Sequence, residues 1–241
     1  MPHTVALVQA RMSSSRLPGK VLADLGGQPM ICFMVDRIRR AKRVDMVAVV
    51  TSDDPSDDPL ADATEAHGIA TVRGPLNDVL ARYVVGADAF DAQTVLRLTG
   101  DCPLIDPGII DQVVELHRST GADYASNIDP PGFADGMDTE CFTRALLDRA
   151  DAAAREQPER EHVTLWMRDP KSGATRANLA AVVPGAHLRL TVDYLDDLDL
   201  VRRVVTAIGK DCGYFDILRL LQQDSALLDA NPHQRNEALK T

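Results

Sequence analysis

Short apolar runs and longer runs with helical spacing alternate through the first half of this 241-residue chain. The strand-like runs are short and rich in β-branched residues, and they cover 5–8, 46–51, 69–72, 94–99 and 122–126. The runs between them place apolar residues three or four positions apart, over 29–41, 60–67, 78–90 and 107–118. This alternation is typical of βαβ units, so it predicts an α/β fold around a largely parallel sheet.

The pattern changes in the second half. Residues 127–138 contain prolines and glycines with little periodicity, and they are predicted to leave the sheet as a loop. Helices are predicted over 143–155, 159–168, 195–209 and 215–228. Strands are predicted over 175–183 and 187–192, joined by Pro184-Gly185 as a hairpin, and the polar tail from Asn231 is expected to fray. We expect one domain over 1–241, with 127–185 as an inserted flap or dimerisation arm.

Composition excludes several classes of partner. The formal net charge is −10, which disfavours binding to nucleic acid or to an anionic membrane. No run approaches the ~20 apolar residues of a membrane span, and no signal peptide is expected at the N-terminus. The four cysteines are far apart and form no C-x-x-C pair, a pattern that fits reduced thiols in the cytoplasm.

A basic loop, residues 9–20, follows the first strand-like run. It contains three cations and three serines and is closed by Pro-Gly; the cations are Arg11, Arg16 and Lys20. Each pair of such charges in contact costs about 1 kcal/mol in water, so the cluster predicts an anionic ligand. A strand, a polar loop and a helix form the usual cradle for a phosphorylated ligand in α/β proteins.

The loop matches neither common phosphate motif. A P-loop requires Gly where Ser14 stands and Ser or Thr where Val21 stands. No G-x-G-x-x-G follows the first strand either, so the dinucleotide fingerprint is absent. The loop therefore indicates another class of nucleotide site, with a polyphosphate as its simplest ligand.

One phrase occurs twice, as Leu96-Arg97-Leu98-Thr99-Gly100-Asp101 and as Leu188-Arg189-Leu190-Thr191-Val192-Asp193. Each copy is an alternating strand-like segment that ends in Asp. Ligands of open parallel sheets bind outside the carboxyl ends of the strands, where both carboxylates would meet if the two segments are close. Each Asp could hold Mg²⁺ there or could cap the helix that follows it.

The wording Gln-Ala-Arg-Met-Ser-Ser-x-Arg-Leu-Pro-Gly-Lys at residues 9–20 resembles the signature of the sugar nucleotide cytidylyltransferases. It is closest to their spore-coat polysaccharide biosynthesis branch, the SpsF type. The resemblance implies a Rossmann-like, GT-A-like nucleotidyltransferase fold of three layers with a mostly parallel mixed sheet. It also implies catalytic roles for Lys20, Arg11 and Arg16, and a nucleotide site for CTP that includes Gln9, Ala10, Ser13 and Ser14.

The two aspartates lie in phrases that resemble metal motifs of the same family. Leu98–Ile105 resembles the Q/T-G-D-x-P-x-I/L motif, and 191–198 resembles the late I/V-D-x-x-x-D-L motif. The resemblance implies that Asp101 and Asp193 hold Mg²⁺. This chain has Tyr194-Leu195 where the family usually has Glu-Pro or Thr-Pro, a departure that affects the turn rather than the carboxylate.

Three further segments resemble the family. The first, 74–83, matches G-x-x-x-D-V-L-x-R-Y, which implies nucleotide contacts by Asp78 and Arg82; the chemistry alone equally fits an N-cap and its i+4 partner. The others match D-G-x-D-x-E at 135–140 and R-E-H-V-T at 160–164. They imply a substrate-binding group made of Asp135, Asp138, Glu140 and His162. The acidic segment could instead hold a second metal or be a solvated loop, and His162 could be structural.

These features together predict a Mg²⁺-dependent cytidylyltransferase that activates an acidic sugar with CTP, releases pyrophosphate, serves surface polysaccharide biosynthesis and forms a homodimer. One alternative is a glycosyltransferase of the same fold, which normally shows D-x-D, whereas Cys102 follows Asp101 here. The other is an inactive nucleotide-binding partner of a polysaccharide pathway.

Overall fold

The computed structural model describes residues 3–229 and 233. Seven strands form one sheet in the order β5-β4-β1-β6-β8-β7-β9. In that order their bounds are Ala70–Gly74, Met46–Ser52, Thr4–Gln9, Thr94–Thr99, Glu140–Thr143, Tyr124–Ser126 and Arg176–Asn178. Strand β8 runs antiparallel to both of its neighbours, and the other pairs are parallel. The mostly parallel mixed sheet predicted from the sequence is confirmed.

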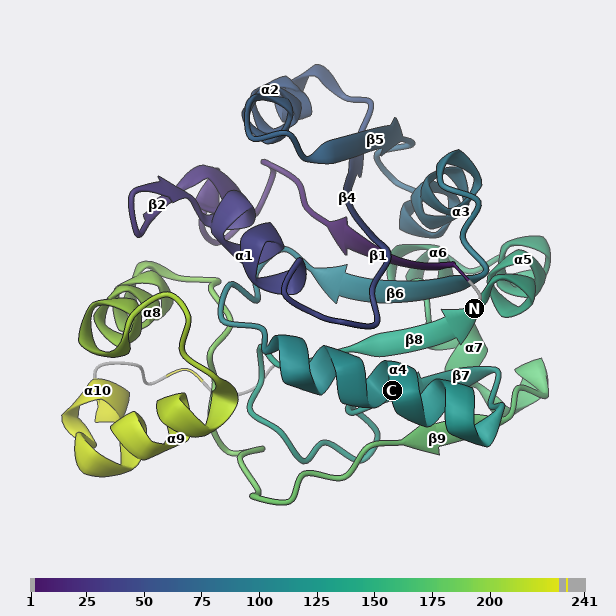
Figure 1. The fold of residues 1–241 in the computed structure, drawn as a ribbon. Coiled ribbons are helices and arrows are strands. Elements are labelled where there is room, and N and C mark those ends of the chain that lie inside the picture. Colours follow the sequence, from purple (N-terminus) through teal and green to yellow (C-terminus); the bar gives the residue numbers. More distant parts are fainter. Residues whose placement is uncertain (1–2, 230–232, 234–241) are drawn as a thin grey trace.

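Helices cover both faces of the sheet, which gives three layers (Figure 1). One face carries α1 (Met30–Ile38), α2 (Asp58–Ala66) and α4 (Pro107–Thr120). The other carries α3 (Val79–Ala89), α5 (Arg144–Ala153), α6 (Gln157–Glu161) and α7 (Leu165–Arg168). A third group packs beside the sheet: α8 (Leu195–Ile208), α9 (Tyr214–Gln223) and α10 (Ala226–Asp229).

Shorter elements connect these parts. A small antiparallel ribbon joins β2 (Asp24–Leu25) to β3 (Gln28–Pro29), and three single 3₁₀ turns lie at Lys20–Leu22, Pro55–Asp57 and Pro170–Ser172. The first of these turns ends the basic loop.

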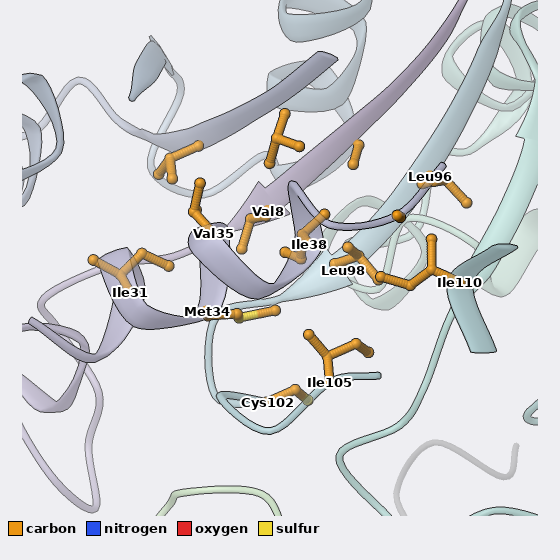
Figure 2. Close-up of a cluster of buried hydrophobic side chains, with 14 of the residues drawn as sticks. Val8, Ile31, Met34, Val35, Ile38, Leu96, Leu98, Cys102, Ile105 and Ile110 are labelled. Carbon is orange, nitrogen blue, oxygen red and sulfur yellow. The ribbon is translucent and has the colours of Figure 1, made fainter. Parts of the chain in front are cut away.

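Alternation along the central strand explains why both faces are covered. In β1, Ala6 and Val8 belong to the cluster under α1 and α4, whereas Val5 and Leu7 belong to the cluster under α3 and α5. A strand buried on both faces has the continuous apolar sequence seen at residues 5–8. Figure 2 shows the first cluster, where one face of α1 lies over β1 and β6 through side chains that include Ile31, Met34, Val35 and Ile38.

Two predicted helices are interrupted. The predicted helix 159–168 is two short helices, because Val163 between them has a left-handed backbone with φ of 50°. The predicted helix 215–228 is likewise divided into α9 and α10 around Asp224. The predicted fraying from Asn231 concerns residues outside the described part of the chain.

The predicted hairpin at 175–192 is wrong. Strand β9 covers only residues 176–178 and pairs in parallel with β7 at the edge of the sheet. Its supposed partner pairs with the 127–138 loop instead: Asp135 N–H donates to Leu188 O at 2.9 Å, and Leu190 N–H donates to Asp135 O at 2.7 Å. Strand β8, which the sequence analysis missed, inserts between β6 and β7, so residues 127–185 contribute two strands to the main sheet.

No helix within 3–229 is both long enough and apolar enough to cross a membrane.

Helix α3 approaches the sheet closely at Gly86. A Cβ built there would lie 2.9 Å from Val50 Cγ1 and 3.0 Å from Leu7 Cδ1. Both neighbours are fully buried, so they have little room to move. Glycine therefore sets the distance between α3 and strands β1 and β4.

We expect Gly86→Val to lower the free energy of unfolding by about 1–3 kcal/mol, the range for overpacking a dense core. The matched control is Ala89→Val, which places the same side chain at an exposed position of α3 and should cost less than about 1 kcal/mol. Urea unfolding followed by circular dichroism measures both. Equal stabilities of the two variants would contradict the close packing.

Candidate active site

A cavity of about 320 Å³ lies where strands β1 and β6 end. Most of the residues predicted for the site line it: Gln9, Ala10, Arg11, Ser14, Arg16, Lys20, Arg82, Asp101, Asp135, Asp138, His162 and Asp193. Three predicted residues do not line it: Ser13, Asp78 and Glu140. The basic loop, the two aspartates of the repeated phrase and both segments predicted to bind substrate thus meet in one place.

Lys20 joins the two aspartates. Its ammonium lies 2.8 Å from Asp193 Oδ1 and 3.6 Å from Asp101 Oδ2, and it also donates to Val192 O at 2.6 Å. The Val192 N–H donates to Asp101 O at 2.8 Å, so the backbone itself holds the two phrases side by side. This arrangement gives the shared cavity that the near-repeat predicted.

Asp193 is the most heavily paired carboxylate of the site. Arg16 and Lys20 both contact its Oδ1 at 2.8 Å, and Arg189 contacts its Oδ2 at 2.9 Å. Burial alone would raise the pKa of this carboxyl, but Lys20, Arg189 and Arg16 lower it to about 2. Asp193 is therefore ionised at any physiological pH.

Neither aspartate caps a helix. The cap of α4 is Asp106, whose Oδ1 accepts from the Gly108 and Ile109 N–H groups. At the start of α8 the acceptor is Asp197, which takes the N–H groups of Asp193 and Tyr194 at 2.7 and 2.9 Å. The carboxylates of Asp101 and Asp193 thus lie among the side chains that line the cavity.

Arg189 was not predicted, and it connects three carboxylates. Its guanidinium lies 2.9 Å from Asp193, 3.0 Å from Asp197 and 3.5 Å from Asp135, and its residue is 6% exposed. Burial alone would lower the pKa of Arg189, but Asp197 and Asp193 raise it above its ordinary value. Arg97 and Arg189 occupy the same place in the repeated phrase, and that coincidence was a signal that could have identified both.

The 135–137 turn lies against the backbone of Leu190 because of one glycine. Gly136 has φ of +102°, and a Cβ there would lie 2.9 Å from the Leu190 carbonyl carbon. A left-handed glycine without a side chain permits this contact and so brings Asp135 within reach of Arg189.

Asp57 holds the basic loop in place through a hydrogen bond to its backbone. This fully buried carboxylate accepts from Met12 N–H at 2.7 Å, and its other oxygen accepts from Thr51 and from both Ser52 donors. Burial alone would raise the pKa of Asp57, and these hydrogen bonds lower it instead. Asp57 lies in the acidic turn after β4, so its role depends on tertiary contacts that the sequence does not show.

Two cations on the cavity wall form no ion pair with any residue that the structure describes. Within residues 3–229, neither Arg11 nor Arg82 forms an ion pair, and Arg82 Nε is buried without a hydrogen-bond partner. Burial lowers the pKa of Arg82, which is 3% exposed, and the neighbouring Arg11 lowers it further. An anion or a hydrogen-bond acceptor in the cavity would satisfy both groups.

Asp78 and Glu140 do not line the cavity, but each binds an arginine that lies in or next to its lining. Asp78 caps α3 through Ala81 N–H and binds Arg160 through both carboxylate oxygens, which holds the adjacent Glu161 and His162 at the cavity. Glu140 is 3% exposed and binds Arg97, which does line the cavity. The direct ligand contacts expected of these two residues have no support in this geometry.

The side chains of the cavity supply only some of the ligands that a divalent cation needs. Asp101 and Asp193 offer hard carboxylate oxygens at one edge of the cavity, but no group of three or more His, Cys, Asp or Glu side chains assembles a ready metal cage among the described residues. Mg²⁺ commonly binds one or two carboxylates and takes its other ligands from substrate phosphates and water. The two aspartates fit that mode.

Removing Arg189 should be costly because it would leave its carboxylates buried and underpaired. We expect Arg189→Met to lower the free energy of unfolding by about 3–5 kcal/mol, as for a broken buried pair. Arg219→Met is the control, because the Arg219–Asp216 pair is exposed and worth less than about 1 kcal/mol. A loss in Arg189→Met no larger than in the control, measured by urea unfolding at pH 7, would contradict this reading.

The low pKa of Asp193 predicts an acid-sensitive contribution to stability. A carboxyl with a depressed folded-state pKa stabilises the fold above its ordinary pKa of 3.8, and this contribution is lost as pH falls through about 2. The span corresponds to about 2 kcal/mol. Asp193→Asn should therefore flatten the decline in unfolding free energy between pH 5 and pH 2. Parallel curves for the two proteins would refute the assignment.

Comparison with protein families and related sequences identifies relatives of this chain. The family model described as Cytidylyltransferase matches residues 5–181. The spore coat polysaccharide biosynthesis protein SpsF of Bacillus subtilis (strain 168) is 31% identical over 233 residues, which cover 93% of this chain and 96% of that protein. The 3-deoxy-manno-octulosonate cytidylyltransferase of Anaeromyxobacter dehalogenans (strain 2CP-1 / ATCC BAA-258) is 40% identical over 116 residues, 47% of each chain.

A solved cytidylyltransferase structure from Leptospira borgpetersenii serovar Hardjo-bovis (strain JB197) superposes with a TM-score of 0.91 at 29% identity, over 98% of this chain and 100% of that one. The fold and the family match over residues 5–181 indicate the same family, and the cavity is consistent with it. This chain belongs to the cytidylyltransferase family of nucleotidyltransferases.

Proposed function

We propose that this protein transfers the cytidylyl group of CTP to a hydroxyl of an acidic sugar, with Mg²⁺ as its cofactor, in surface polysaccharide biosynthesis. One observation carries the proposal: Lys20 contacts Asp193 and Asp101 inside a cavity that Arg11 and Arg16 also line. This arrangement supports one site in which the cations would bind a triphosphate and the carboxylates would bind a metal.

The chemistry requires positioning and charge stabilisation. A sugar hydroxyl oxygen bonds to the α-phosphorus of CTP and gives its proton to water, the bond between the α- and β-phosphates breaks, and pyrophosphate leaves as negative charge accumulates on the phosphoryl oxygens. Arg11, Arg16 and Lys20 are the groups that would neutralise this charge, with Arg82 as a further donor. Arg11 forms no ion pair within residues 3–229 and can bind the phosphates directly, whereas Arg16 and Lys20 would first exchange their contact with Asp193 for the phosphates.

Asp101 and Asp193 would hold the Mg²⁺ ion. When bound, the ion supplies electrostatic stabilisation to the phosphates. The pairing of Asp193 with three cations keeps its carboxylate ionised and its orientation fixed before the nucleotide arrives.

The acceptor side is proposed to comprise Asp135, Asp138 and His162, together with Glu161 on the same wall. The carboxylate oxygens of Asp135, Asp138 and Glu161 can accept hydrogen bonds from sugar hydroxyls, and the ring nitrogens of His162 can donate or accept one. The names of two relatives support the acceptor class: one is a polysaccharide biosynthesis protein, and the other acts on 3-deoxy-manno-octulosonate. We further propose that the enzyme acts in the cytoplasm, where CTP is made, and that it acts as a homodimer.

Loss of a central cation or carboxylate should remove transition-state stabilisation without unfolding the protein. We expect Lys20→Ala or Asp101→Ala to lower kcat by on the order of 10²–10³-fold, as for the loss of one oxyanion-type contact. Pyrophosphate release from CTP, measured over a panel of acidic sugars with Mg²⁺, reports this directly.

The exposed Lys42→Ala is the matched control and should retain full activity. Wild-type rates in both site variants would overturn the proposal. Hydrolysis or transfer from a sugar nucleotide without pyrophosphate would instead indicate a glycosyltransferase, and CTP binding without turnover on any acceptor would indicate an inactive binding partner.

A further inference from the structure

Gln9, the last residue of β1, has a carboxamide that the structure can orient in one way only. Its Oε1 atom lies 3.2 Å from Arg97 Nε and 3.3 Å from the Tyr83 hydroxyl. Arginine only donates hydrogen bonds, so the Gln9 atom that faces Arg97 must be the oxygen. The Nε2 amide group is left for the cavity, which Gln9 lines.

A buried network fixes this orientation. Arg97 Nη1 donates to Glu140 Oε2, and Glu140 Oε1 accepts from the Tyr124 hydroxyl and the Thr164 hydroxyl at 2.6 Å each. Tyr124 and Thr164 are almost fully buried, and Glu140 and Arg97 are 3% and 8% exposed. Each of these four side chains hydrogen-bonds another member of the network, so a rotation of one would leave its buried partner unpaired.

The charges of the network are equally fixed. Burial alone would raise the pKa of Glu140 and lower that of Arg97, but their mutual attraction reverses both shifts. Glu140 is therefore a carboxylate and Arg97 a guanidinium throughout the neutral pH range, and Gln9 always meets a donor on that side.

We propose that Gln9 selects cytosine over uracil by presenting a hydrogen-bond donor to the base, and that Arg97 and Glu140 are the positioning residues that hold it. The inference rests on the proposed CTP site. The Watson–Crick edge of cytosine offers acceptors at O2 and N3, whereas uracil carries an N–H donor at N3. An amide N–H facing N3 therefore bonds to cytosine and opposes uracil.

Other side chains of the cavity wall also present hydrogen-bond donors. Arg82 and Arg11 are donor-only groups without an ion pair in the described chain, and Arg82 Nε is buried and unpartnered. Val79, one turn before Arg82 on α3, adds an apolar contact for the face of a base. These donors can bind the O2 acceptor that cytosine and uracil share, or a phosphate oxygen, so discrimination between the two bases is left to the Gln9 amide at N3.

The proposal also accounts for Glu140. Its position in the acidic 135–140 segment suggested direct substrate contact, yet it lies behind the cavity. Through Arg97 it acts on the carboxamide of Gln9, which gives this buried carboxylate a part in specificity.

The test is the ratio of CTP to UTP dissociation constants, measured by isothermal titration calorimetry with Mg²⁺. Gln9→Glu keeps the shape of the side chain, but the atom that faces the cavity becomes an acceptor. We expect the preference for CTP over UTP to fall by roughly 10- to 100-fold, the range for one directional base contact. Gln9→Leu should lower the preference less, because it removes the donor without adding an acceptor.

Glu140→Gln tests the positioning part. It removes the charge that holds Arg97, so the preference for CTP should fall several-fold, while thermal unfolding checks that the variant remains folded. An unchanged ratio in folded Glu140→Gln would refute the role of the network. Gln112→Glu, an exposed change of the same chemistry on α4, is the control and should retain the wild-type ratio.

The outcomes separate this inference from the proposed function. A wild-type protein that binds neither nucleotide would contradict the CTP site itself. A wild-type protein that prefers CTP, with a ratio within twofold of wild type in Gln9→Glu, would refute the assignment of Gln9 alone.

Discussion

The ion pair between Lys20 and Asp193 is the contact on which the site depends, because it joins segments 173 residues apart in the chain. It places the end of the basic loop against the segment before α8, at the mouth of β1 and β6. Asp101 completes the contact from the sheet itself. The pair fixes the Lys20 ammonium opposite Asp193, while Arg189 and the Val192–Asp101 backbone hydrogen bond also hold the Asp193 segment in place.

The same pair resolves an electrostatic problem that the sequence raised. Three cations in twelve residues repel one another, and a ligand is one remedy. In the structure Asp193 compensates Lys20 and Arg16 before any ligand binds, whereas Arg11 and the buried Arg82 form no ion pair in the described part of the chain. The cavity thus combines a neutralised half, which keeps its geometry, with a positively charged half that still requires an acceptor or an anion.

Local patterns predicted much of this molecule. Strand β6 begins and ends at the residues that the apolar run indicated, and the repeated phrase correctly suggested that Asp101 and Asp193 would meet. The sequence-based predictions were wrong where the residues that pair are far apart in the sequence. The 187–192 segment alternates like a strand but pairs with the loop around Asp135, and β8 has only four residues whose place between β6 and β7 no local rule specifies. The roles of Arg189, Asp57 and Glu140 likewise depend on neighbours far away in sequence.

The position of Asp193 has a consequence for the order in which the protein is made. Every strand that the structure assigns to the main sheet ends by residue 178, and the N-terminal parts of a chain generally fold first during synthesis. A nascent chain can therefore build its whole sheet, basic loop included, while Lys20 has Asp101 beside it but still lacks Asp193. The cavity gains Asp193 only when the segment before α8 has left the ribosome, so the sheet can be complete before the wall of the cavity is.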